Sequence, residues 1–356
     1  MTRFAEEFVV VQVVPTGIGA EIGGYVGDAT PATNAIAGAA DVVISHPNVV
    51  NGVTLNAAEE NVFYVEGYSL DRFFRDQIAL RPIVSNRIGV VLDVAGKGTK
   101  GYDLAINTIE TMRTVKGVEI VEYTETQRSV NVKAVKTKAG AFVGEVKDPR
   151  IFLRPCLKLV REGAEAIAIA THIDVKDKDL KLYFKGKGPN PYGGAEAVIS
   201  HAVSRRFGVP CAHAPILSAE EIKKEMFSGK VDPRAAAEAI GPAYLGSVLQ
   251  GLSDAPHLVP FEKSHDDDIF LADVNAVVLP YNCMGGIPAL AAQKQNIPII
   301  AVKENKTLMQ VPPKKLNLEN VIVVDNYLEV IGIVTAMKEG IDFRMIRRPV
   351  KKLKKI

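Results

Sequence analysis

Short apolar runs alternate with helical stretches along most of the chain. The first run, residues 9–14, is rich in β-branched residues and ends at Pro15, which predicts a buried strand. Similar runs predict strands at 42–45, 88–94, 118–123, 166–170, 209–212, 276–280, 298–302 and 321–324. Helices are expected between them, at 31–40, 102–115, 149–162, 194–206, 219–227, 233–250, 286–295 and 327–339.

Strands separated by helices indicate right-handed crossovers and parallel sheets. We therefore predict an α/β fold made of two Rossmann-like, mostly parallel units, with one long doubly wound sheet as the alternative. The first unit would span residues 1–150 and the second 151–356, ending in a basic tail at 351–355. Alternating residues around Lys138-Ala139-Gly140 predict a β-hairpin insertion near 128–147. The polar segment 257–268 is predicted to be a loop.

Composition narrows the class of protein. The 356 residues are 47% apolar and 24% charged with a net charge of +2, which fits a soluble globular protein and disfavours a nucleic-acid partner. No apolar run is long enough to span a membrane, and the start of the chain does not have the pattern of a signal peptide, so we expect no membrane partner. The odd number of cysteines (Cys156, Cys211, Cys283) indicates a reducing compartment, and the predicted location is cytoplasmic.

Parallel sheets bind ligands at the carboxyl ends of their strands, so the loops there carry the candidate chemistry. The loop after the first strand holds five glycines in eleven residues, at 17–27, and leads to a helix expected to have Thr30 as its N-cap. Backbone N–H groups in such a loop can approach an anion closely, although the spacing matches neither a dinucleotide fingerprint nor a P-loop. The plain alternative is a long turn that needs positive φ. The ligand-binding residues predicted here are Thr16, Gly17, Gly19, Asp28 and Thr30.

Two further loops are candidates for the same ligand. After strand 42–45, His46 is predicted to be catalytic, and Asn48 and Asn51 to orient a carboxylate or carbonyl; ordinary turn chemistry is the alternative. The loop 186–194 is rich in Gly, Pro and Asn and precedes a helix, which suits phosphate or carboxylate binding, with a rigid surface loop as the alternative. Its predicted binding residues are Lys187, Asn190, Gly193 and Gly194.

Cys283 lies between a predicted strand and a predicted helix N-terminus, beside Asn282, Gly285 and Gly286. Helix N–H groups and the helix dipole lower a thiol pKa, so we predict a reactive thiolate here, with a small buried cysteine as the alternative. His172 closes another strand, where it can act as an acid or a base. No ligand set with zinc spacing is visible, so no metal is expected.

Two segments resemble motifs of the aspartate/glutamate racemase superfamily. They are Asn282-Cys283 after its strand, and residues 163–172, in which Ala170 stands where that family has its second cysteine. The resemblance implies single-cysteine proton chemistry at a carbon next to a carboxylate, with Cys283 as proton donor and His172 as its neighbour. More broadly, residues 15–51 and 282–305 resemble a family catalogued only as a domain of unknown function, which implies no activity.

These candidates lead to one functional prediction and two alternatives. We expect a cofactor-independent isomerase or lyase that acts on a small anionic metabolite between the two units, using Cys283 with His46 or His172. One alternative is a transferase or hydrolase for a phosphorylated or nucleotide substrate, in which the glycine loops dominate. The other is a non-catalytic metabolite-binding or assembly protein whose basic tail docks a partner, and a homo-oligomer is compatible with all three.

Overall fold

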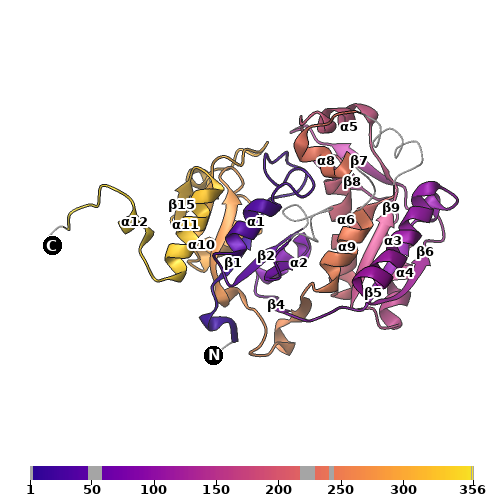
Figure 1. Ribbon diagram of the computed structural model, residues 1–356, viewed down its shortest axis with the longest axis horizontal. Coiled ribbons are helices and arrows are strands. Elements are labelled where there is room, and N and C mark those ends of the chain that lie inside the picture. The colour runs from indigo at the N-terminus through magenta and orange to yellow at the C-terminus, as the bar shows by residue number, and fades with distance from the viewer. Residues whose placement is uncertain (1–2, 47–57, 217–228, 240–243, 354, 356) are drawn as a thin grey trace.

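Two parallel sheets, each covered by helices, form the body of the protein. The structure is a computed structural model that describes residues 3–46, 58–216, 229–239, 244–353 and 355. Figure 1 shows the sheets side by side, with the two ends of the chain on the same side of the molecule. The predicted α/β class with Rossmann-like parallel units is confirmed.

The larger sheet has six parallel strands in the order β15-β14-β13-β1-β2-β3. Its interior strands are continuous apolar runs because both of their faces are covered, as in other parallel sheets. Helices α1 and α11 pack on one face and α2 and α10 on the other. The strands are β1 Val9–Gln12, β2 Val42–Ser45, β3 Val62–Tyr64, β13 Val274–Pro280, β14 Ile299–Val302 and β15 Val321–Val324. The helices are α1 Thr30–Ala37, α2 Gly67–Phe73, α10 Ile287–Lys294 and α11 Tyr327–Lys338.

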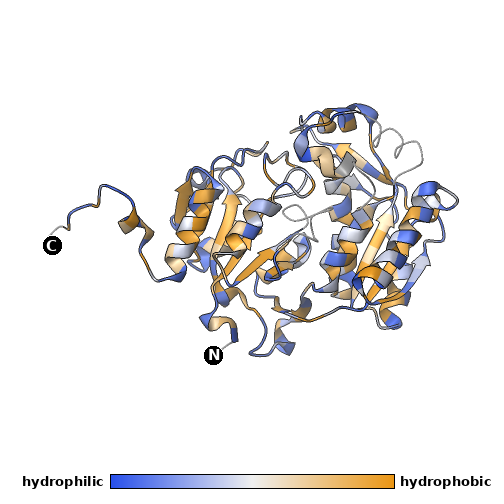
Figure 2. Ribbon diagram, in the orientation of Figure 1, coloured by the Kyte–Doolittle hydropathy of each residue, from blue (hydrophilic) through white to orange (hydrophobic). Residues whose placement is uncertain are grey.

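The second sheet has four parallel strands in the order β11-β9-β5-β6. Helices α3 and α9 cover one face, and α4 and α6 the other. Its strands are β5 Ile88–Leu92, β6 Ile120–Glu125, β9 Ala166–Thr171 and β11 Cys211–Pro215. The helices are α3 Lys100–Lys116, α4 Arg150–Arg161, α6 Gly193–Phe207 and α9 Tyr244–Ser253. In Figure 2 the apolar colour concentrates on the strands inside each unit, while the helices show both colours.

Smaller elements complete the fold. The predicted hairpin is confirmed as β7 Val132–Lys136 paired with β8 Phe142–Glu145, and β10 Ile173–Asp174 extends it. A two-stranded antiparallel sheet joins β4 Ile78–Arg81 to β12 His257–Pro260. Short helices are α5 Asp177–Phe184, α8 Ala236–Ala239, α12 Phe343–Ile346 and the 3-10 turns Arg3–Glu6, Val94–Gly96, Pro233–Ala235, Phe261–Lys263, Leu271–Asp273 and Pro313–Leu316.

The sheets divide the chain differently from the boundary predicted near residue 150. Strand β1 pairs with β13, which belongs to the predicted second unit, and β5 of the predicted first unit pairs with β9. The six-stranded sheet therefore combines both ends of the chain, and the four-stranded sheet is built from the middle of it. We call the six-stranded sheet with its helices the first unit, and the four-stranded sheet with its helices the second unit. The sequence alone suggested one domain boundary because pairing between strands that are distant in the chain leaves no local signal.

Local differences from the predicted elements also have physical reasons. The segment 257–268 was predicted to be a loop, but His257–Pro260 is strand β12, which finds its partner nearly 180 residues away in β4. Helix α1 begins at Thr30 with Ala29 in the capping position, so the prediction of Thr30 as the N-cap is wrong. The predicted helix at 219–227 lies outside the described residues, and the one at 233–250 is a 3-10 turn followed by α8 and, after a gap in the described residues, α9.

The chain crosses between the two sheets twice, and one buried side chain ties the crossings together. Asn86 follows β4 on the way out, and its side-chain N–H groups donate to the carbonyls of Leu252 and Ala255, both at 2.8 Å, on the way back. Its amide oxygen lies 2.9 Å from His257 Nε2, and its backbone N–H donates to Ser253. The side chain and the backbone N–H of this fully buried residue thus bridge the two crossings.

Replacing Asn86 by Ala tests this link. The substitution removes three side-chain hydrogen bonds and leaves buried carbonyl groups without a donor, so we expect the free energy of unfolding to fall by about 3 kcal/mol. Urea unfolding followed by circular dichroism measures the change. A loss of less than about 0.5 kcal/mol would show that the crossings do not depend on this side chain.

Candidate functional site

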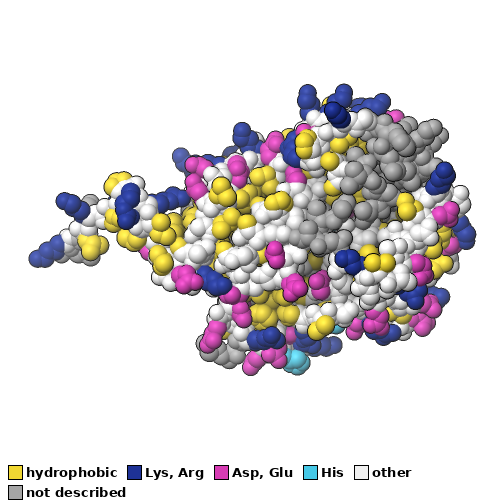
Figure 3. Space-filling view, viewed as in Figure 1, with side chains coloured by type: hydrophobic (Ala, Val, Ile, Leu, Met, Phe, Trp, Pro, Cys, Tyr) yellow, Lys and Arg dark blue, Asp and Glu magenta, His cyan; other side chains and the backbone are white. Residues whose placement is uncertain are grey.

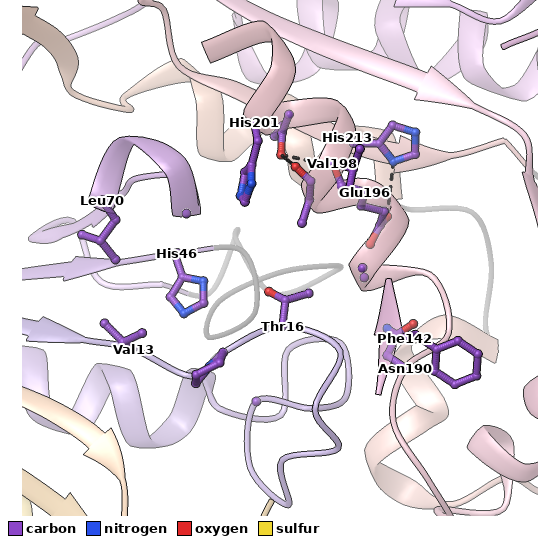
Figure 4. Close-up of a pocket in the computed structure, with 18 of the residues that line it drawn as sticks. Val13, Thr16, His46, Leu70, Phe142, Asn190, Glu196, Val198, His201 and His213 are labelled. Carbon is purple, nitrogen blue, oxygen red and sulfur yellow. Dashed lines mark hydrogen bonds and ion pairs between the residues drawn. The ribbon is translucent and has the colours of Figure 1, made fainter. Parts of the chain in front are cut away.

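A cavity of about 600 Å³ lies between the two sheets. From the first sheet, the carboxyl ends of β1, β2 and β3 reach it; from the second, β11 and the first half of α6 (Figure 4). The start of α10 closes one side and the hairpin strand β8 another. Seven residues predicted from the sequence line it: Thr16, His46, Asn190, Gly193, Gly194, Gly285 and Gly286.

Glycines at the start of α6 allow the two units to approach closely here. A Cβ on Gly193 would lie 2.9 Å from Cγ2 of Thr16, which belongs to the opposite wall. A Cβ on Gly194 would lie only 2.3 Å from the Phe142 carbonyl oxygen, a distance too short for any side chain at this position. Asn190 accepts a hydrogen bond from Tyr192 N–H at 2.8 Å and so shapes the turn into the helix. These residues bring the N-terminus of α6 to the cavity wall.

A buried carboxylate orients a histidine at the cavity. Glu66 follows β3, its side chain is fully buried, and it accepts hydrogen bonds from Tyr68 N–H and Ser69 N–H at the start of α2. Its Oε2 lies 3.5 Å from Nε2 of His201, which extends from α6 and is 42% exposed. The helix N-terminus stabilises the carboxylate, which at 3.5 Å attracts the imidazole electrostatically without an ordinary hydrogen bond. Such a pair is suited to accept and return a proton.

Gly67 makes room for this pair. A Cβ at this position would lie 2.9 Å from His201 Nε2, so any side chain would push the imidazole away from Glu66. The glycine therefore has a function in the site that is separate from backbone conformation. Strand β3, Glu66 and Gly67 form one continuous segment that reaches across to the helix of the other unit.

His46 lies on the first unit's side of the cavity and His201 on the other, and Figure 4 shows both residues bordering it. The Val14 N–H donates to His46 Nε2 at 2.9 Å, so that nitrogen is an acceptor and the neutral ring holds its proton on Nδ1. Burial, helped by the nearby His201, lowers the pKa of His46 to about 4. At neutral pH His46 is therefore an uncharged hydrogen-bond donor.

A third histidine lies deeper in the second unit. His213 is on β11 with its side chain fully buried, and its Nε2 lies 2.9 Å from the Thr171 hydroxyl. Its Nδ1 makes no hydrogen bond to a described residue and lies 3.5 Å from Oε1 of Glu196 in the first turn of α6. The distance exceeds that of an ordinary hydrogen bond, so the pair has unused polar capacity facing the cavity.

The charge of the lining limits the ligand. Among its described residues, Asp71 and Glu196 are acidic and none is Lys or Arg. Burial raises the pKa of Asp71 above its ordinary value. A ligand with several negative charges would meet these carboxylates, whereas one carboxylate could still bind at the N–H groups that begin α6.

The glycine loop after β1 is only partly at the cavity. Gly23, Gly24 and Tyr25 line it, but the predicted residues Gly17, Gly19, Asp28 and Thr30 do not. Gly17 has a φ of +74° and a Cβ there would lie 2.5 Å from the Phe142 carbonyl oxygen, so it serves the close contact with the hairpin. Four of the five glycines have positive φ: Gly17, Gly19, Gly23 and Gly27. The loop thus needs glycine for its backbone shape, as the alternative interpretation held.

Asp28 lies beneath this loop. Its Oδ1 accepts a hydrogen bond from Gly23 N–H at 2.5 Å, and its Oδ2 is buried without a partner among the described residues. Burial raises the pKa of Asp28 to about 6. The carboxyl shapes the loop and does not face the cavity.

Tyr25 fastens the same loop to the second unit. Its ring stacks on Tyr183 with centroids 4.7 Å apart, and the Arg234 guanidinium carbon lies 4.3 Å from the centre of the Tyr25 ring. Arg234 also pairs with Glu21 of the loop at 2.9 Å. The loop therefore holds the two units together around the cavity.

Cys283 does not have the environment predicted for it. It is buried, its Sγ lies 3.3 Å from the Thr307 hydroxyl, and burial raises the pKa of its thiol to about 11. The predicted lowering of that pKa is therefore wrong, because removal from water outweighs the nearby helix start. Neither Cys283 nor Asn282 lines the cavity; only the following glycines do.

The remaining predicted residues lie elsewhere. His172 is half-buried with Nδ1 3.4 Å from the Ile216 carbonyl oxygen, and Lys187 is exposed; neither lines the cavity. The two racemase-like segments lie in different sheets, one at β13 and the other at β9. Asn48 and Asn51 lie outside the described residues.

Sequence patterns gave little warning of the residues that carry most of the site. These are His201, Glu196, His213, Glu66 and Asp71, and none of them is among the predicted site residues. One signal was available for Glu66: an acidic residue directly after an apolar run, followed by Gly and, three positions on, by Ser69. Among the described residues, no group of three or more His, Cys, Asp or Glu is arranged to hold a metal ion, and no helix is both long and apolar enough to cross a membrane.

Comparisons with known proteins place the chain among uncharacterised relatives. Residues 9–347 match the model of a family described as "Protein of unknown function (DUF3326)". An uncharacterised lipoprotein of Synechococcus sp. is 37% identical over 337 residues, which cover 93% of this chain and 91% of that protein. Neither match shows the resemblance to racemases.

The lipoprotein relative overturns one expectation. A cytoplasmic location was predicted from the cysteine count and from the start of the chain, and a relative named a lipoprotein contradicts it. A solved structure, a periplasmic binding protein/LacI transcriptional regulator from Alkaliphilus metalliredigens complexed with D-xylulofuranose, is 9% identical with a TM-score of 0.17. The match covers 71% of this chain and 92% of the chain in that structure, and a TM-score this low supports no argument.

The lowered pKa of His46 predicts a pH-dependent stability. As the pH falls from the ordinary pKa of 6.5 toward about 4, the unfolded chain takes up a proton that folded His46 refuses, so the folded state loses stability. We expect wild type to lose about 2 kcal/mol more than His46→Gln between pH 7 and pH 5 in urea unfolding. The raised pKa of Asp28 acts in the opposite direction but is common to both proteins. Equal pH dependence in the two proteins would contradict a buried neutral His46.

Proposed function

We propose a function for this chain, which belongs to the DUF3326 family of proteins of unknown function. The cavity between its two sheets is the active site of a cofactor-independent enzyme. The reaction is proton transfer of the isomerase or lyase type on a small metabolite with one carboxylate. The observation that carries the proposal is that His201 lines the cavity with its Nε2 3.5 Å from the buried carboxylate of Glu66.

Each wall supports one part of this chemistry. His201, oriented by Glu66, takes a proton from a carbon next to the substrate carboxylate and returns it. His46 presents a neutral Nδ1–H donor from the opposite wall, which suits the negative charge that develops on the substrate. The first N–H groups of α6, at Gly193 and Gly194, suit the substrate carboxylate.

The acidic lining refines the substrate class. Asp71 and Glu196 disfavour a phosphorylated or nucleotide substrate, which would bring two or more negative charges beside them. They favour an amino or hydroxyl group on the metabolite instead. Small amino acids and hydroxy acids therefore match the charge of the lining best, and a cavity of about 600 Å³ has room for them.

Deuterium exchange tests the proposal even while the product of the reaction is unidentified. The protein is incubated in D₂O with a panel of small amino acids and hydroxy acids, and loss of the proton next to the carboxylate is followed by NMR. We expect exchange with at least one compound, and a loss of about 100-fold or more in His201→Gln, the usual effect of removing a general base. Gly67→Ala should also slow exchange, because its Cβ displaces the imidazole.

Cys283→Ser is the matched control. Since its thiol is buried beside Thr307 and away from the cavity, exchange should stay within about twofold of wild type. Loss of exchange in Cys283→Ser with normal exchange in His201→Gln would favour the cysteine mechanism and overturn the proposal. Binding of a compound from the panel without any exchange would favour the second candidate, a metabolite-binding protein without turnover.

We also propose that the protein is attached to a membrane by lipid, as the name of its relative indicates for that protein. Fractionation of cells that naturally produce the protein tests this. We expect it in the membrane fraction, released by detergent and not by high salt. Recovery in the soluble fraction would contradict the proposal.

A further inference from the structure

The C-terminal segment forms an arm that leaves the body of the protein. After α11, the described residues 341–353 run through the short helix α12 and then extend away from the first sheet, as Figure 1 shows at the end marked C. We call this segment the C-terminal arm. It takes no part in the cavity.

The arm concentrates positive charge. The last sixteen residues of the sequence hold seven Lys or Arg and one Asp, a net charge of +6. Because the whole chain carries +2, the first 340 residues carry a net −4. The charge is therefore segregated: an acidic body carries a strongly basic end. Figure 3 shows the dark blue side chains along the arm.

The arm also exposes aliphatic side chains between its cations. Leu353 is fully exposed and Ile346 is 60% exposed, and Ile341, Met345 and Val350 are exposed as well. Figure 3 shows these apolar atoms next to the basic ones on the same projection. Five exposed aliphatic residues within thirteen positions are costly in water unless a partner covers them.

The base of the arm is fixed while its end is available. Phe343 packs against the core beneath α11, and Arg347 pairs with Glu329 of α11 at 3.1 Å. Beyond Pro349, the side chains of Lys351 and Lys352 make no hydrogen bond or ion pair with any residue that the structure describes. The end of the arm therefore presents Lys351 and Lys352 to solvent, while its base is attached to α11.

We propose that the C-terminal arm binds the surface of a membrane rich in anionic lipids. Cations attract the headgroups, and aliphatic side chains enter the boundary with the acyl chains. Nucleic acid fits less well, because residues 344–356 contain no aromatic ring on which a base could stack. The expectation of no membrane partner rested on the lack of a spanning segment, but binding at a surface needs only a short basic and apolar stretch.

Co-sedimentation with vesicles tests the arm directly. The full chain, purified without lipid attached, is mixed with vesicles of phosphatidylcholine alone or with added phosphatidylglycerol. We expect binding only to the vesicles with phosphatidylglycerol, weakened by salt because the attraction is electrostatic. The double variant Lys351→Glu/Lys352→Glu should bind at least about tenfold more weakly, and Leu353→Asn should also weaken binding.

A matched charge reversal elsewhere is the control. Lys100 and Lys116 are exposed on α3, far along the chain from the arm, and Lys100→Glu/Lys116→Glu changes the net charge equally. It should retain most of the binding. Equal loss in both double variants, or equal binding to both kinds of vesicle, would overturn the proposal. So would tighter binding to an oligonucleotide, or a dimer on size-exclusion chromatography that only the arm variant abolishes.

Discussion

The two crossings between the sheets are the constraint on which the rest of the structure depends. Because the chain leaves the first unit after β4 and returns at β12, both units are tied at one edge, where Asn86 joins the outgoing and returning segments. With that edge fixed, the carboxyl ends of β1, β2 and β3 face the helix α6 of the other unit. A buried hydrogen bond, donated by the Tyr64 hydroxyl to the Cys211 carbonyl at 3.2 Å, joins β3 of the first unit to β11 of the second.

The proposed chemistry of the cavity depends on these two opposed walls. The first unit contributes a buried carboxylate and a neutral histidine, and the second contributes the helix that carries His201. The Glu66–His201 pair needs both units, because Glu66 follows β3 of the first and His201 extends from α6 of the second. Burial explains both departures from ordinary acidity: it makes His46 a neutral donor and keeps the thiol of Cys283 protonated.

The sequence predicted the layers of the fold better than its connections. Most buried strands were visible as continuous apolar runs, and strand β2 was placed at 42–45 to the residue. The pairing of β1 with β13 was beyond reach, because apolar runs do not say which distant strand is the neighbour. The site residues were hard to predict for the same reason. Loops at strand ends marked the right edge of the sheet, but Glu66 becomes meaningful only when α6 brings His201 to it.

We propose that His46 and His201 face one ligand from opposite walls of the cavity. The most direct measurement is long-range ¹H–¹⁵N NMR of the histidine side chains, assigned with single His variants, in the presence of a compound from the panel that binds. We predict that His46 keeps its proton on Nδ1 in the free protein, and that the ligand shifts the imidazole signals of both residues together. A ligand that binds while leaving both imidazoles unchanged would contradict it.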